Sequence, residues 1–546
     1  MDISAVKSAR VRVLRRFAGD ESGSMIVLAL IFFTLMIMVG GLAVDLMRYE
    51  ARRTQLQQTT DRAVLAAASL RQPLVPEDVV NDYFTKAGLI DKLKSVRVTE
   101  DLNRKMVEVE AESLIDPFFV HMLGIEDMTA PADGTAEERI TDVEISFVLD
   151  ISGSMNSYNR IQNLKSAATE FVDLIFEGSE ANRTTMSIVP YSGQVNLGAD
   201  LIDEFNVSLD HNYSYCVDLP SSSFSSTTVS TSTAIPQAGN MDPFYSNQAA
   251  SLYYCPPQTA NTVLSLSADT DALKAKINGL VADGNTSIDI GMKWGTLLLD
   301  TASGPIIDGL ISKDVVEDRF SDRPLDPATT EVLKIVVLMS DGENTTEYVL
   351  KDPYRANTNS NIYRRDSDGQ LAAYHDQSGS DDYYMPGIKY EVANSSSGKN
   401  TFSETTKVKG KNVTKWYTRW RSQPFGTNTG WTRLKWPEVW QYSTIGYVAS
   451  NLYATPLGES SSTWQGNFRS TTGTSTKNTR LQQICNAAKA KGYTVYTIGF
   501  EAPTAGKTQL SQCATSTGYF YEVVGTELRT ALRSIASQVT HLRLTQ

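Results

Sequence analysis

The apolar and polar positions first set apart one long uncharged segment near the start of the chain. Met25 to Val44 is twenty residues without a charged side chain, about 30 Å as a helix, which matches the apolar core of a bilayer. Good helix formers then continue to Pro73. We therefore predict a membrane helix at 25–44 that continues as a stalk helix at 45–72. A cleaved signal peptide, and a separate second helix, are the alternatives.

Beyond the stalk, the pattern changes twice. Val96–Thr99 and Met106–Ala111 alternate apolar and polar residues, which is typical of half-buried strands and predicts a small α+β module at 73–140. From residue 141 apolar strands alternate with amphipathic helices, and this order predicts an α/β domain with a mostly parallel sheet covered on both faces. The predicted elements after the first strand are Arg160–Phe176, Thr184–Tyr191, Asp269–Leu280, Val332–Ser340, Thr479–Lys491, Tyr493–Phe500, Thr508–Thr517, Tyr519–Val523 and Thr526–Val539.

Two insertions interrupt this domain, at about 199–262 and 343–478. The second is far longer than an ordinary loop and holds six of the chain's seven tryptophans. Disordered segments are poor in aromatic residues, so we expect these tryptophans to form a small core of the insertion, with Trp436–Tyr453 as an amphipathic helix. The alternative is an exposed aromatic surface that recognises a sugar or a protein.

Candidate chemistry lies where strands end. The apolar run Phe147–Leu149 leads into Asp150, Ser152 and Ser154, and ligand sites of open α/β sheets form just beyond the carboxyl ends of strands. Thr286 precedes a predicted helix, and Asp341 follows the strand that ends at Ser340. Carboxylate and hydroxyl oxygens are hard ligands that suit Mg²⁺. The alternative is five ordinary turn residues of an unrelated domain.

These residues, in this order, resemble a von Willebrand factor type A domain, a Rossmann-like α/β fold. The resemblance covers all five positions of its metal-ion-dependent adhesion site (MIDAS). It implies that Ser152 and Ser154 contact the ion directly and that Asp150 and Asp341 act mainly through water. Thr286 would bind directly or through water. The implied ion is Mg²⁺, with Mn²⁺ or Ca²⁺ as alternatives, and such a site binds a partner rather than catalysing a reaction.

The N-terminal region is similar to the TadG-like proteins of the tight-adherence (Flp) pilus system. The similarity lies in Arg15–Ser24, the apolar run, Ala43–Asp45 and Leu56–Ala68. True prepilins carry a glutamate where this chain has Leu28, so cleavage by a prepilin peptidase is not expected.

This second resemblance implies a non-catalytic pilus-assembly component in the bacterial inner membrane. Residues 1–24 would be cytoplasmic, and the C-terminal domain periplasmic or extracellular. The metal site would take an acidic residue of another pilus or envelope protein. A surface or pilus-tip adhesin that binds host protein or glycan is the alternative function, and an accessory subunit of a metal chelatase is a third.

Charge and cysteines narrow these classes further. The net charge of −12 argues against nucleic-acid binding. An even number of cysteines beyond a membrane predicts disulfides, although four cysteines allow three connectivities. The cysteines fall as two local pairs along the chain, so we favour Cys216–Cys255 and Cys485–Cys513. A Cys₄ zinc site is the alternative, but it would lack C-x-x-C spacing. The four histidines are scattered and no Gly-x-Ser-x-Gly motif is present, so we expect no enzyme.

Overall fold

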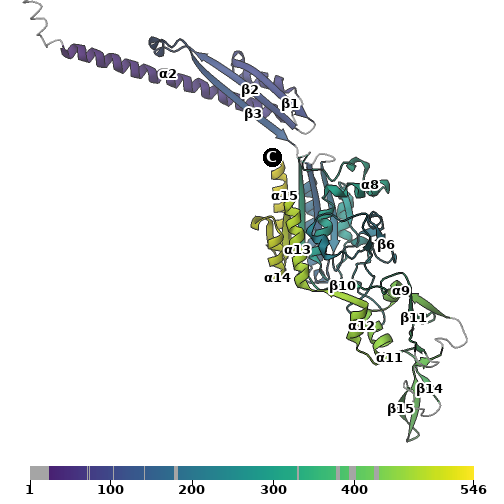
Figure 1. The fold of residues 1–546 in the computed structure, drawn as a ribbon. Coiled ribbons are helices and arrows are strands. Elements are labelled where there is room, and N and C mark those ends of the chain that lie inside the picture. The colour runs from purple at the N-terminus through teal and green to yellow at the C-terminus, as the bar shows by residue number, and fades with distance from the viewer. Residues whose placement is uncertain are drawn as a thin grey trace, which may run out of the picture. The chain divides into compact units, whose positions relative to one another are not determined.

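The protein divides into two compact units, at about residues 1–140 and 141–542. The computed structural model describes residues 24–69, 72, 74–101, 104–139, 142–177, 183–328, 331–376, 382–392, 401–422 and 430–545 (Figure 1). Each unit has its own buried core, so each is described separately.

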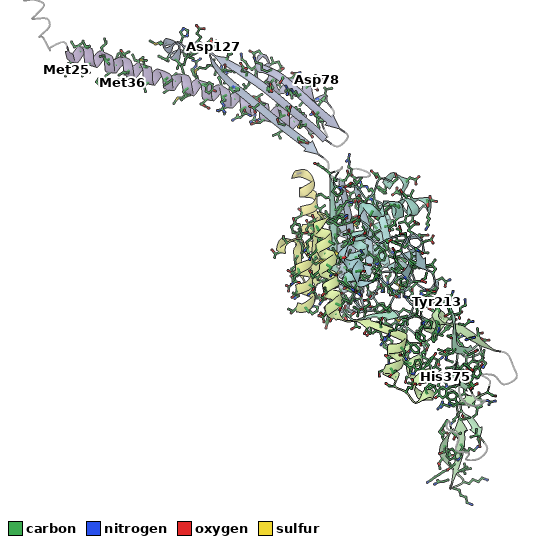
Figure 2. The ribbon with its side chains drawn as sticks, in the orientation of Figure 1. Met25, Met36, Asp78, Asp127, Tyr213 and His375 are labelled. Atoms are coloured by element: carbon green, nitrogen blue, oxygen red, sulfur yellow. A yellow bond between two sulfur atoms is a disulfide. The ribbon has the colours of Figure 1, made fainter. Side chains whose placement is uncertain are left out.

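The first unit is built on one long helix, α2 (Ser24–Ala67), of 44 residues. The apolar segment and the stalk are therefore one continuous helix, and the alternative of two separate helices is wrong. Within the described ranges, α2 is the one helix long and apolar enough to cross a membrane. Figure 2 shows Met25 and Met36 on this helix, and both side chains are exposed.

The second half of α2 packs against a small α+β module. The module consists of α3 (Pro76–Lys86) and an antiparallel sheet in the order β1-β2-β3. Its strands are β1 (Leu93–Asp101), β2 (Arg104–Ile115) and β3 (Met128–Arg139). Alternate residues of β2, Val107 and Val109, are buried against Leu56 and Val64 of α2, as the alternating pattern predicts. A short 3₁₀ helix, η3 (Val120–Leu123), lies in the β2–β3 connection.

The second unit contains a six-stranded sheet in the order β21-β20-β9-β4-β5-β8. The pairs β21–β20, β20–β9, β9–β4 and β4–β5 are parallel, whereas β8 is antiparallel to β5. The strands are β4 (Asp142–Asp150), β5 (Thr184–Tyr191), β8 (Leu264–Ser267), β9 (Val332–Ser340), β20 (Thr494–Phe500) and β21 (Phe520–Val523). The other sheets of three or more strands are antiparallel, so a mostly parallel sheet does not describe this mixed α/β chain as a whole.

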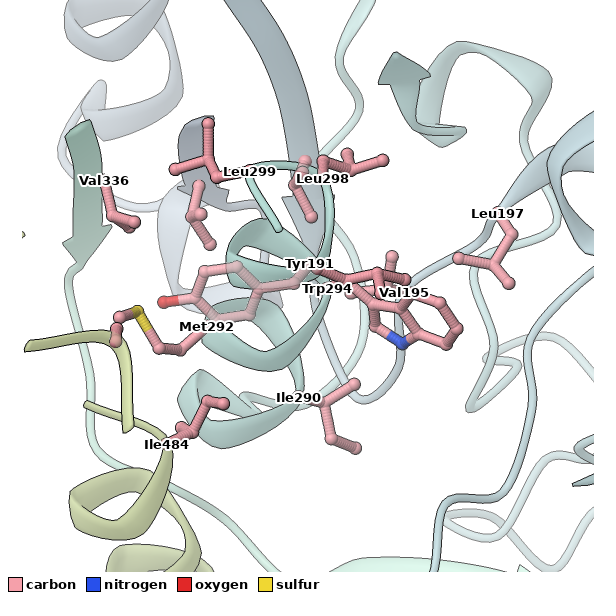
Figure 3. Close-up of a cluster of buried hydrophobic side chains, with 14 of the residues drawn as sticks. Tyr191, Val195, Leu197, Ile290, Met292, Trp294, Leu298, Leu299, Val336 and Ile484 are labelled. Carbon is pink, nitrogen blue, oxygen red and sulfur yellow. The ribbon is translucent and has the colours of Figure 1, made fainter. Parts of the chain in front are cut away.

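Helices cover both faces of this sheet. In β4, Val148 faces one core while Phe147 and Leu149 face the other. The first core (Figure 3) is closed by α5 (Gly198–Ile202), α7 (Ile288–Leu297), α8 (Gly304–Ser312), α13 (Thr474–Ala490) and α14 (Thr504–Cys513). The second is closed by α4 (Arg160–Phe176), α6 (Thr270–Gly279) and α15 (Glu527–Thr545).

The two insertions of the second unit share a third core. Met241 and Tyr254 of the first insertion pack with Trp436, Trp440 and other residues of the second. Paired strands β10 (Glu347–Leu350) and β19 (Arg469–Thr472) connect the second insertion to the domain. The first insertion contains β6 (Val207–Ser208) and β7 (Ile235–Pro236).

The second insertion folds into two small antiparallel sheets and a group of short helices. The strands are β11 (Asn359–Arg365), β12 (Leu371–Tyr374), β13 (Tyr383–Tyr384), β14 (Tyr390–Val392), β15 (Thr401–Val408), β16 (Lys411–Thr418), β17 (Trp420–Arg421) and β18 (Trp431–Lys435). The expected single helix over Trp436–Tyr453 is wrong, because Ser443 is extended, with φ −144° and ψ 146°, and ends the first part. The parts are α9 (Trp436–Tyr442), α10 (Ile445–Tyr447) and the π-helical η9 (Val448–Ala454), followed by α11 (Thr455–Leu457) and α12 (Ser461–Phe468).

Candidate functional site

Two neighbouring parallel strands bring the candidate carboxylates to one edge of the sheet. β4 ends at Asp150, and Asp341 follows the last residue of β9. Because β4 and β9 are paired in parallel, their carboxyl ends meet. The Ser340 hydroxyl donates a hydrogen bond to Asp150 Oδ2 over 2.6 Å, and the Ser152 backbone N–H donates to Asp150 Oδ1 over 2.8 Å. Asp150 therefore fixes the loop that carries the two serines.

The serine hydroxyls converge on Asp341. Ser154 Oγ donates to Asp341 Oδ1 over 2.7 Å, and Ser152 Oγ lies 3.5 Å from the same oxygen. The two hydroxyl oxygens are 3.1 Å apart. Ligand oxygens at right angles around Mg²⁺, each at roughly 2.0–2.1 Å from the ion, lie about 3 Å from one another. The 3.1 Å between the two serine hydroxyl oxygens is close to this spacing, and Asp341 Oδ1 lies beside both of them.

Thr286 lies on the third loop at this edge. The Gly153 N–H donates to the Gly284 carbonyl over 2.9 Å, so the serine loop and the Thr286 loop are in direct contact. A methyl group built on Gly342 would lie 3.5 Å from Thr286 Oγ1, which places this hydroxyl beside the residue after Asp341. All five residues predicted from the sequence thus lie on three adjoining loops.

The helix after Thr286 packs unusually close to the sheet. A Cβ on Gly291 of α7 would lie 2.5 Å from the Tyr191 ring, and a Cβ on Gly295 would lie 2.4 Å from Val148 Cγ2. Only glycine permits this approach at both positions. Tyr191 is buried next to α7 (Figure 3), and its hydroxyl donates to the Met339 carbonyl over 2.9 Å. This packing holds the Thr286 loop against the ends of the two strands.

Burial makes this group of carboxylates electrostatically costly. Asp150 is fully buried; burial, followed by the nearby charge of Asp341, raises the pKa of Asp150 to about 7. Burial also raises the pKa of Asp341, although hydrogen bonds from Ser154 and Arg160 oppose the rise. Two close carboxylates favour a positive charge between or beside them, and a bound cation would satisfy that requirement.

The sequence prediction missed the residues that orient Asp341. Arg160, the first residue of α4, places Nη1 2.9 Å from Asp341 Oδ2 and Nε 2.8 Å from Glu501 Oε2. Glu501 also accepts a hydrogen bond from the Gly525 N–H over 3.0 Å. Arg160 therefore holds one oxygen of Asp341 and leaves the other facing the serines. Glu501 lies 341 positions away from Arg160 in the chain, and no local pattern pairs the two residues.

A metal ion at this candidate site would depend on hydroxyl groups as ligands. Within the described ranges, no three or more His, Cys, Asp or Glu side chains are grouped so that they could hold a metal ion. The candidate site has two carboxylates and three hydroxyls instead. Such a set of hard oxygen donors fits Mg²⁺ or Mn²⁺ and is a poor set for zinc or copper.

The two disulfides that the sequence favoured are present. Cys216 pairs with Cys255 in the first insertion, and Cys485 pairs with Cys513. The second disulfide joins α13 to the end of α14, and α14 packs against the loop that follows Asp341: a Cβ on Gly506 would lie 2.1 Å from the Gly342 carbonyl oxygen. The disulfide therefore stabilises the position of α14 beside the residue that follows Asp341.

The comparison with protein families identifies the N-terminal region. Residues 23–70 match the family described as "Putative Flp pilus-assembly TadE/G-like". The chain thus carries the segment of a TadE/G-like pilus-assembly protein, and the resemblance predicted from the sequence is confirmed. This segment and the long apolar helix α2 point to a membrane-anchored protein. No curated protein matches the chain.

Several of the similar solved structures are pilus proteins. The von Willebrand domain of the type V pili tip protein Mfa5 from Porphyromonas gingivalis is 14% identical, with 74% of this chain and 98% of that chain covered and a TM-score of 0.32. The pilus adhesin SpaC from Lactobacillus rhamnosus GG is 10% identical, with 82% and 34% covered and a TM-score of 0.30. The pilus adhesin RrgA from Streptococcus pneumoniae is 12% identical, with 83% and 49% covered and a TM-score of 0.28.

Proposed function

We propose that this chain is a non-catalytic component of Tad/Flp pilus assembly whose second unit, a von Willebrand A domain, binds a partner protein through a divalent cation. The supporting observation is that Ser152 Oγ and Ser154 Oγ lie 3.1 Å apart, close to the spacing of two ligands at right angles around one small ion, and that both lie beside Asp341 Oδ1. In this proposal α2 anchors the chain in the bacterial inner membrane, with the N-terminus cytoplasmic and the second unit periplasmic or extracellular.

Each residue of the site has a distinct part. Ser152, Ser154 and Thr286 would supply hydroxyl ligands, while Asp150 and Asp341 would hold water molecules around the ion. When bound, the ion supplies a positive charge that an acidic side chain of the partner can bind. Arg160 keeps Asp341 Oδ2 turned away from the serines, so that Oδ1 stays in the site. Such binding needs a divalent cation and is lost in EDTA.

The surface-adhesin alternative loses part of its support. It relied on exposed aromatic residues in the second insertion, but Trp420, Trp436 and Trp440 are buried, and the last two belong to the core that the two insertions share. A host-binding function would then depend on the candidate metal site rather than on these tryptophans. The alternative therefore becomes one outcome of the experiment below.

The test uses Ser154→Ala, because Ser154 is exposed and its replacement should leave the fold intact. Ser157→Ala, an exposed serine of the same loop, is the matched control. With equal protein levels in the membrane, we expect Ser154→Ala to abolish pili counted by electron microscopy, and to weaken Mn²⁺ binding by the purified chain in calorimetry. Ser157→Ala should change neither.

The possible results separate the hypotheses. Loss of pili together with loss of Mn²⁺ binding supports the metal site in assembly. Normal pili on cells that no longer adhere support the adhesin function. Normal pili, normal adhesion and unchanged Mn²⁺ binding would show that the site is neither a metal site nor needed for the pilus.

A further inference from the structure

The loop between β2 and β3, residues 116–127, carries an exposed apolar tip. The side chains of Phe118, Met122 and Ile125 are 67%, 74% and 46% exposed. They lie within one short stretch around η3, on the first unit of the protein. Grouped apolar side chains that face solvent mark a contact surface, because isolated ones are ordinary but clusters are not.

Contacts with α2 fix where this tip lies along the membrane helix. Within residues 25–47 only Gly41 and Asp45 are buried, and their four-residue spacing puts them on one face of the helix. A Cβ on Gly41 would lie 2.3 Å from Phe119 Cγ, so the Phe119 ring rests directly on the glycine backbone. Gly41 belongs to the uncharged segment Met25–Val44. The loop therefore reaches the level of the last turn of that segment.

Asp45 holds the loop at this level. Its carboxylate accepts hydrogen bonds from the backbone N–H groups of Phe118, Phe119 and Val120 over 3.0, 2.7 and 2.9 Å. Arg48 completes the attachment, with its guanidinium carbon 3.8 Å from the centre of the Phe118 ring and its Nη1 3.5 Å from Asp45 Oδ1. Because its oxygens accept several N–H groups, this buried carboxylate needs no water as a hydrogen-bond partner and can lie at the edge of a bilayer.

We propose that this loop is a second membrane contact of the chain, with Phe118, Met122 and Ile125 inserted among the lipids where α2 leaves the bilayer. The occupant of the apolar surface is lipid because the surface is continuous with the exposed apolar face of α2, where Leu42 and Val44 are 49% and 45% exposed. The inference rests on membrane anchoring through α2 and is independent of the metal site.

The charges around the tip select the kind of lipid contact. Asp116, Glu126 and Asp127 are exposed on either side of the apolar residues, and Figure 2 shows Asp127 at the loop end of the module. These carboxylates would be repelled by anionic headgroups. Arg48, a cation that contacts the tip, is already engaged by Asp45, the Phe118 ring and the Asp116 carbonyl. Contact is therefore apolar, at the boundary of headgroups and acyl chains, and does not need anionic lipid.

Depth measurements on the full chain in phosphatidylcholine nanodiscs test this proposal. All four native cysteines are paired, so Met122→Cys introduces a single thiol for a nitroxide label. Phe33→Cys, within the apolar segment, and Leu65→Cys, 20 residues and about 30 Å beyond Asp45 on α2, calibrate bilayer and water. We expect the ratio of oxygen to nickel-complex collisions at Met122→Cys to be several-fold above that at Leu65→Cys, towards the Phe33→Cys value.

A ratio equal to that of Leu65→Cys would overturn the proposal, and so would protection of the label from both reagents, which would indicate a protein contact. Asp45→Ala in the Met122→Cys chain gives a second measurement. Without its acceptor the loop should leave the helix and the ratio should fall. An unchanged ratio would overturn the positioning role of Asp45. Neither readout depends on an occupied metal site, because the label lies in the first unit and the candidate metal site in the second, so failure here is separate from failure of the proposed metal site.

Discussion

The close packing of α14 against the loop that follows Asp341 can be tested by adding one methyl group to Gly506. In Gly506→Ala, the new Cβ would lie 2.1 Å from the Gly342 carbonyl oxygen and 3.0 Å from its carbon. Ordinary contacts of this kind exceed 3 Å, so α14 and the loop must separate by roughly 1 Å. Forcing a methyl group into such a contact costs about 1–3 kcal/mol. Alanine favours a helix over glycine by about 1 kcal/mol, which offsets part of this loss.

Gly466→Ala is the matched control, because Gly466 also lies within a helix, α12, but a Cβ there would have nothing within 4 Å. The difference between the two variants isolates the steric cost, which we expect to be about 1–3 kcal/mol. Urea unfolding of the detergent-solubilised chain, followed by tryptophan fluorescence, measures it. All seven tryptophans lie after residue 141, so the signal reports on the second unit.

Mn²⁺ affinity gives a second readout of the same change. A loop shifted by about 1 Å exceeds the tolerance of a ligand site, roughly 0.5 Å. Gly506→Ala should therefore bind Mn²⁺ more weakly than the wild type, and Gly466→Ala should not. Equal stability of the two variants would refute the steric argument. A large difference in stability with unchanged Mn²⁺ affinity would show that Gly342 does not position a metal site.

Two further predictions concern the disulfides and a buried acid. Replacing both Cys485 and Cys513 by alanine opens a loop with a sequence separation of 28 and should cost about 3–4 kcal/mol in the same urea assay; a loss below about 1 kcal/mol would contradict this. Burial, followed by the charge of Glu347, raises the pKa of Asp218 to about 8 from 3.8. The folded state then holds a proton that the unfolded state releases, so this contribution to stability is complete below about pH 4 and lost as the pH rises to 8. Asp218→Asn should remove that loss, and a stability difference from wild type that does not grow between pH 5 and pH 8 would contradict it.

Local sequence patterns were sufficient for the elements that form the candidate site. The expected bounds of α4, β5 and β9 coincide with those in the structure, because apolar runs and helical periodicity are strong in these segments. Parallel strands ending in polar residues then place Asp150 and Asp341 at one edge without further information. The disulfides also followed, because each pair is close in sequence.

What the sequence could not show depends on contacts between distant segments. Arg160 reaches Glu501 and Asp341 only after α4, β9 and β20 have assembled, so no spacing rule links them. The break at Ser443 is set by packing against the first insertion, where the Asp242 carbonyl accepts the Ile445 N–H. The short strands of the second insertion were not predicted, because segments of so few residues carry little periodicity.

The two ends of the second insertion, next to the paired strands β10 and β19, both contact the candidate site. Five residues separate Asp341 from β10, and within them Thr345 exchanges backbone and side-chain hydrogen bonds with Thr286. At the other end of the insertion, Lys477 donates to the Thr286 carbonyl over 3.2 Å. Both ends of the insertion are thus tied to one residue of the candidate site. A displacement of either end of the insertion would therefore reach Thr286 through these hydrogen bonds, so the second insertion and the candidate site are mechanically coupled.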